Sequence, residues 1–174
     1  MLYVAVGCRA ALALVFALSV AGKLVGGGAF EEFSRSIVQM KAVPVSLVGL
    51  TARAVVAAEA LILVLIIAPL PMANLLGCLL AGLLTLGFCA AIIRSIRSGN
   101  RVPCRCFGRS STPLGGRQVA RNAVLLAVTV LGAATASSTD DRQLAAALVA
   151  VIAGLFVGLL IASFDDIAEL IVPA

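Results

Sequence analysis

Histidine is absent from the 174-residue chain. Haem held by paired histidine ligands is therefore excluded, and the three methionines form no cluster that would bind a soft metal. No glycine-rich phosphate loop with its lysine is present, so nucleotide-driven transport has no visible basis. With these groups missing, few side chains apart from the five cysteines can carry redox chemistry.

Charged residues are also scarce. They make up 12% of the sequence, whereas hydrophobic residues make up 62% and the mean hydropathy is +1.17. A soluble globular core does not tolerate this balance, which is typical of an integral membrane protein. Strand-like alternation is missing as well, so the backbone groups must be satisfied inside helices. We therefore expect an all-α protein whose partner is the lipid bilayer and which binds no nucleic acid.

Long apolar stretches define the predicted architecture. A spanning helix needs about 20 mostly apolar residues, and five stretches meet this need: residues 4–21, 45–70, 73–93, 119–135 and 144–164. We predict a single integral membrane domain over residues 1–174, folded as a polytopic helical bundle. Apolar residues at helical spacing over 29–40 predict a further helix that lies in the membrane interface. A cysteine- and arginine-rich loop, 94–118, separates the third and fourth spans.

The distribution of charge predicts the orientation of the bundle. With five spans, one membrane face carries ten basic residues, and the opposite face carries only Arg9 and Arg142. Basic residues concentrate in cytoplasmic loops. We therefore predict that the loop 94–118 faces the cytoplasm and that the N-terminus lies outside.

Cys104 and Cys106 lie one residue apart in this loop, between Arg101 and Arg109, with Arg105 separating them. Nearby positive charge favours the thiolate, which is both the nucleophile and the metal ligand. A disulfide across one intervening residue closes a small ring, and strained disulfides are more oxidising and more labile. Ordinary cysteines stay reduced in the cytoplasm, so a permanent bridge is not expected there.

Three interpretations of this cysteine pair stay open. Cys104 and Cys106 exchange between dithiol and disulfide, or bind a soft metal with Cys89 as a third ligand, or pack the loop without any chemistry. For Cys8 and Cys78 the default interpretation is a packing role, because a buried cysteine behaves as a small hydrophobic residue.

Glu59 lies near the middle of the second span, where a charged side chain costs about 3 kcal/mol on insertion scales. Its carboxyl group must be protonated or paired, and Lys23 and Arg121, at the ends of neighbouring spans, are candidate partners. An intramembrane carboxyl is a candidate functional group. Two roles stay open for Glu59: a structural polar clasp between helices, and a site that handles a proton or a membrane quinone.

Several of these features together resemble the MauE family of methylamine utilisation membrane proteins, which is related to DoxX-like bundles. The resemblance covers roughly residues 10 to 130. It rests on these features of the sequence: Phe16 to Lys23, the Phe33 helix that leads to Val43-Pro44, Glu59, the run Cys104-Arg105-Cys106-Phe107-Gly108, and Arg121-Asn122. The cysteine run followed by Arg-Asn is its most specific part.

The resemblance implies a four-helix core, here with an added fifth transmembrane helix, in the cytoplasmic membrane of a bacterium. It also implies thiol–disulfide redox work beside a thioredoxin-like partner, in support of a disulfide-rich dehydrogenase subunit. The proposed partner in that family works outside the membrane, whereas the charge count places this loop inside. The leading interpretation is an electron-transfer component that uses Cys104 and Cys106. The alternatives are a soft-metal-handling protein and a non-catalytic accessory subunit of a larger membrane complex.

Overall fold

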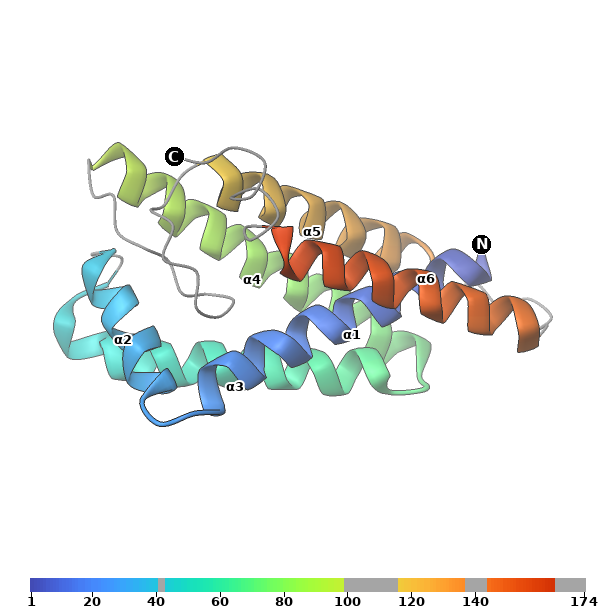
Figure 1. Ribbon diagram of the computed structural model, residues 1–174, viewed down its shortest axis with the longest axis horizontal. Coiled ribbons are helices and arrows are strands. Elements are labelled where there is room, and N and C mark those ends of the chain that lie inside the picture. Colours follow the sequence, from blue (N-terminus) through green and yellow to red (C-terminus); the bar gives the residue numbers. More distant parts are fainter. Residues whose placement is uncertain (41–42, 99–115, 137–143, 165–174) are drawn as a thin grey trace.

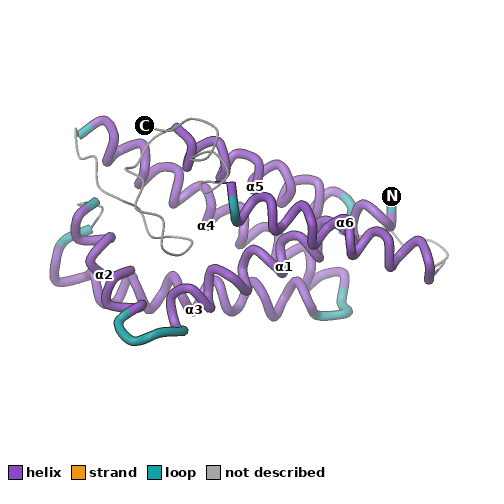
Figure 2. Tube along the Cα trace, viewed as in Figure 1, coloured by secondary structure: helices purple, strands orange, loops and turns teal. Residues whose placement is uncertain are grey.

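A computed structural model describes residues 1–40, 43–98, 116–136 and 144–164 of the chain (Figure 1). In this part of the chain the secondary structure is helical and no strand is present (Figure 2). The helices, in chain order, are α1 (Leu2–Leu24), α2 (Ala29–Gln39), the short 3-10 helix η1 (Val45–Leu47), α3 (Val48–Ile67), α4 (Pro71–Arg97), α5 (Gly116–Ala134) and α6 (Leu144–Ala162). The predicted all-α membrane class is confirmed.

Each helix lies where the sequence predicts one, with small shifts at the ends. The helix α3 ends at Ile67, three residues before the predicted end, and Pro71 then occupies the first turn of α4. Proline is favoured there because it lacks the N–H that the first turn leaves unbonded. At its other end α4 continues to Arg97, four residues beyond the predicted boundary. The helix predicted over 29–40 forms as α2, and its position in the membrane interface stays a prediction.

Four helical segments of the described chain are long and apolar enough to cross a membrane: α1, residues 45–67, α4 and α6. The helix α5 forms at the predicted fourth span but is not in this group. Its first two turns contain Arg117, Gln118, Arg121 and Asn122, which lower its hydropathy. A crossing by α5 therefore stays a prediction.

The helices α1 and α6 run in the same direction and lie very close together. Gly154 of α6 lies against the backbone of Gly7, and Gly158, one turn later, lies against the backbone of Ala11. Small residues four apart allow this approach, because a larger side chain would separate the two backbones. The two helices therefore enter and leave the bundle at the same ends (Figure 1).

The helices α4 and α5 run in opposite directions. Gly132, near the end of α5, faces Cys78 near the start of α4, and Asn122 forms a side-chain hydrogen bond with Cys89 near the other end. The chain therefore returns along the bundle between the end of α4 and the start of α6, and α5 occupies that path. The direction of α5 is the one that a fifth crossing requires, and the crossing itself stays a prediction.

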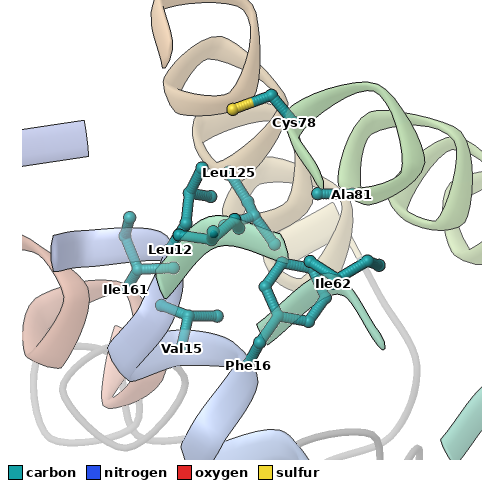
Figure 3. Close-up of a cluster of buried hydrophobic side chains, with 9 residues drawn as sticks. Leu12, Val15, Phe16, Ile62, Cys78, Ala81, Leu125 and Ile161 are labelled. Atoms are coloured by element: carbon teal, nitrogen blue, oxygen red, sulfur yellow. The ribbon is translucent and has the colours of Figure 1, made fainter. Parts of the chain in front are cut away.

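The main hydrophobic core lies where α1, α3, α4, α5 and α6 meet (Figure 3). Its buried residues are Leu12, Val15, Phe16, Ile62, Ile66, Cys78, Ala81, Leu125 and Ile161. The outward faces of the helices are also apolar, and Leu83, Val149 and Ile152 are each about two-thirds exposed. An all-round hydrophobic helix is typical of a membrane span, so these faces are the expected contact with lipid.

Arg9 of α1 caps the C-terminal end of α3. Its guanidinium donates hydrogen bonds to the carbonyl oxygens of Ile66 (3.1 Å) and Ala68 (3.0 Å). The last carbonyls of a helix have no partner within the helix, and the Arg9 guanidinium supplies partners for these two.

We expect Arg9→Met to destabilise the bundle by about 2 kcal/mol, because two charge-assisted hydrogen bonds are lost. Detergent-induced unfolding of the purified protein measures this change. The matched control is Arg35→Met, since Arg35 is exposed on α2. Equal stabilities of the two variants would contradict a capping role for Arg9.

Candidate functional site

The cysteine pair predicted to carry the chemistry, Cys104 and Cys106, lies outside the described residues. Of the loop predicted over 94–118, the described parts are the end of α4 and the start of α5. The exchange, metal-binding and packing interpretations of the pair therefore stay predictions.

A buried ion pair lies between α1 and α3. The ammonium nitrogen of Lys23 lies 2.8 Å from Oε1 and 2.9 Å from Oε2 of Glu59, and each side chain is only 1% exposed. The hydroxyl of Ser19 accepts a hydrogen bond from Lys23 (2.6 Å) and donates one to Glu59 Oε1 (3.0 Å). Of the two partners that the sequence offers for Glu59, the structure brings Lys23 to it.

Local helix geometry explains this arrangement. Ser19 and Lys23 are four residues apart, so they lie on one face of α1, one turn from each other. That face meets the middle of α3, where Glu59 points inward. A buried charge without a partner costs several kcal/mol. Here both carboxylate oxygens are engaged, and the two opposite charges form a neutral unit inside the bundle.

The helix α2 covers this ion pair. The ammonium nitrogen of Lys23 lies 5.0 Å from the centre of the Phe33 ring, close enough for a cation–π interaction. Phe33 and Ile37 of α2 also pack on Val48 and Ala52 at the start of α3. The apolar face of α2 therefore holds the helix against the bundle and shields the charged pair from solvent.

The three cysteines in the described part of the chain are not part of the cluster that Ser19, Lys23 and Glu59 form. Cys8 and Cys78 both border Gly132, since a Cβ at that glycine would lie 3.5 Å from Cys8 Cβ and 3.1 Å from Cys78 Sγ. Cys89 is about three helical turns further along α4 and interacts with Asn122. No group of three potential metal ligands forms among the described residues, and the metal interpretation, which needs Cys104 and Cys106, stays a prediction.

A buried polar strip on α5 goes beyond what the sequence analysis predicts. It consists of Gln118, Arg121 and Asn122, and Ser95 of α4 is buried as well; all four side chains are at most 4% exposed. The sequence analysis singles out Arg121 and Asn122 but neither Gln118 nor Ser95. The signal was present, because Gln118, Arg121 and Asn122 recur at the spacing of one helical face. These polar groups gather at the end of the α4–α5 pair that adjoins the loop predicted to hold the cysteines.

Comparison with known protein families identifies a match over most of the chain. Residues 1–135 match the model of the family described as methylamine utilisation protein MauE. The match includes α1 to α5 and ends before α6. No curated protein and no solved structure matches the chain.

Proposed function

The chain belongs to the MauE family of membrane proteins, and from this premise we propose that it is a membrane thiol–disulfide redox component that uses Cys104 and Cys106. Family membership and four apolar helices point to a multi-pass membrane protein with an accessory role. The observation that carries the finer proposal is the Cys104-Arg105-Cys106 run, in a chain without histidine. Adjacent guanidinium groups favour the thiolate that exchange chemistry requires.

The proposed reaction is a disulfide exchange with a thioredoxin-like partner. A thiolate of the pair attacks a disulfide sulfur of the partner, the partner's S–S bond breaks, and a mixed disulfide forms. The second thiolate then attacks the mixed disulfide, so the pair becomes a disulfide and the partner leaves as a dithiol. Two electrons and two protons pass to the partner, and the reverse sequence passes them back. A membrane quinone is a candidate second acceptor, because its reduction to quinol takes up two electrons and two protons.

The contacts of Glu59 favour the clasp over the proton-handling role. Its carboxylate binds both Lys23 and Ser19 and has almost no exposed surface. A group that releases protons to solvent needs a path to water, whereas a clasp needs only good pairing. Glu59 in this proposal holds α1 against α3, and so fixes the scaffold from which the loop 94–118 extends.

The proposed location is the cytoplasmic membrane of a bacterium, with the N-terminus outside and the loop 94–118 on the cytoplasmic face. The described cations fit this orientation. One face of the bundle has four cations at or near its helix ends: Lys23, Arg94, Arg97 and Arg117. The opposite face has Arg9. Basic residues mark the cytoplasmic side.

Alkylation of a variant that retains only Cys104 and Cys106 tests the proposal. Cys8, Cys78 and Cys89 are replaced by alanine, and intact cells are treated with a membrane-impermeant maleimide before and after reduction. We expect protection until lysis, and then labelling that increases after reduction, because part of the pair is oxidised in the cell. Mass spectrometry of the labelled protein measures both results.

Two outcomes would count against parts of this proposal. Labelling in intact cells would reverse the orientation and place the pair outside the cytoplasm. A pair that is fully reduced under all growth conditions, together with unchanged disulfide formation in cells that carry Cys104→Ser and Cys106→Ser, would contradict the exchange function itself.

A further inference from the structure

An apolar slot lies between α3 and α4, with α2 across one end. Its volume is about 500 Å³, within the range of small-molecule sites. It runs from Thr51 and Arg94, in the first turn of α3 and the last turn of α4, to Ile62 and Leu80 near the middle of the bundle. Ile37 of α2 lines the slot near the start of α3, where it packs with Val48 and Ala52. The slot therefore has one polar end at the membrane face and an apolar body inside.

The slot is open beside a glycine, which adds no side chain to it. Gly87 of α4 lines it, and a Cβ added there would meet no atom within 4 Å. An empty gap in a membrane bundle forfeits the dispersion contacts that its walls would otherwise make. The bilayer core consists of hydrocarbon chains. A lipid chain can therefore fill the gap without the desolvation of any polar group.

The charge at the end of the slot selects among lipids. Arg94 is the one charged residue that lines it within the described part of the chain. No described carboxylate pairs with Arg94. A lysine or arginine near the membrane surface attracts an anionic head group by about 1 kcal/mol, and the hydroxyl of Thr51, at the same face, offers a hydrogen-bond donor.

From these features we propose that the slot binds one acyl chain of an anionic phospholipid, with the phosphate at Arg94. The cation places the head group, and the apolar walls hold the chain. A quinone would also fit the apolar body, but its uncharged ring gains less from the guanidinium than a phosphate does. The proposal stands independently of the chemistry of Cys104 and Cys106.

Native mass spectrometry tests this site. The protein is released from nanodiscs that contain equal amounts of phosphatidylglycerol and phosphatidylcholine with identical chains. We expect one retained lipid, with phosphatidylglycerol in excess. Gly87→Leu places a branched side chain in the slot, and we expect this obstruction to abolish retention. The matched control is Gly49→Leu on α3, where an added Cβ also meets nothing within 4 Å but which does not line the slot.

A charge variant tests the head-group end separately. Arg94→Gln lowers the preference for phosphatidylglycerol about fivefold, the ratio that corresponds to about 1 kcal/mol, while one lipid stays bound. Arg97→Gln, on the same helix but outside the slot, leaves the preference unchanged. Arg94 is exposed, so its replacement does not threaten the fold.

Several results would overturn the proposal. These are no retained lipid on the wild-type protein, equal retention of the two lipids, or loss of lipid from Gly49→Leu to the same degree as from Gly87→Leu. A quinone that displaces phosphatidylglycerol when added to the nanodiscs, and that Gly87→Leu releases, would assign the slot to a different ligand.

Discussion

Replacing Lys23 with methionine is expected to destabilise the helical bundle by about 3–5 kcal/mol. The variant leaves the carboxylate of Glu59 buried without its cation, and an uncompensated buried charge costs about that much. Removing both charges, with Lys23→Met and Glu59→Leu together, is expected to restore most of the stability, because apolar groups of similar volume need no partner. Detergent-induced unfolding of the purified protein in mixed micelles measures both changes.

The control for this pair is Arg53→Met, which removes an exposed cation from α3 without touching Glu59. We expect a change of less than about 0.5 kcal/mol there. If Lys23→Met and Arg53→Met proved equally mild, the ion pair between α1 and α3 would not be a significant source of stability. If the double variant were as unstable as the single one, size and shape rather than charge would explain the loss.

Gly154→Leu is expected to separate α6 from α1. Any Cβ at Gly154 collides with the backbone of Gly7, and a backbone cannot move aside as the tip of a side chain can. Overpacking of this kind costs about 1–3 kcal/mol or more. Because Cys8 and Gly154 border the same small cavity, Cys8 should then react faster with a membrane-permeant maleimide. The rate of Cys8 labelling measures the separation.

Two comparisons make this result specific. Ala145→Leu adds the same bulk to an exposed position of α6 and should leave the labelling rate of Cys8 unchanged. Cys89, on α4, serves as an internal reference, since it does not line the cavity that Cys8 and Gly154 border. Unchanged Cys8 labelling in Gly154→Leu would show that α6 does not depend on this contact.

The sequence predicts the helices well because their signal is local. Apolar stretches longer than about 17 residues have few alternatives to a spanning helix. Pro69 lies in the turn between α3 and α4, and Pro71 begins α4. The sequence predicts that the Glu59 carboxyl group is either protonated or paired, since a charged side chain inside a bundle requires a partner. Its partner could be narrowed only to Lys23 or Arg121, because the choice depends on which helix faces meet.

Other features depend on packing that no single stretch reveals. The contact of Gly154 with Gly7 joins the first and last described helices, and spacing alone does not say which helix a small-residue face will contact. The slot beside Gly87 depends on the absence of a side chain between two helices whose register is set elsewhere. The predicted redox pair, Cys104 and Cys106, still rests on sequence and family membership.

The close contact between α1 and α6 also has a consequence for biosynthesis. The helix α1 precedes, and α6 follows, the other described helices, so the ribosome makes α1 well before the partner that covers its Gly7 and Ala11 face. Chains fold from the N-terminal end as they are made. That face of α1 must therefore stay in lipid, or against a temporary protein neighbour in the membrane, until α6 has been inserted. Truncation before α6 would leave the part that matches the family with an uncovered small-residue surface available to other helices.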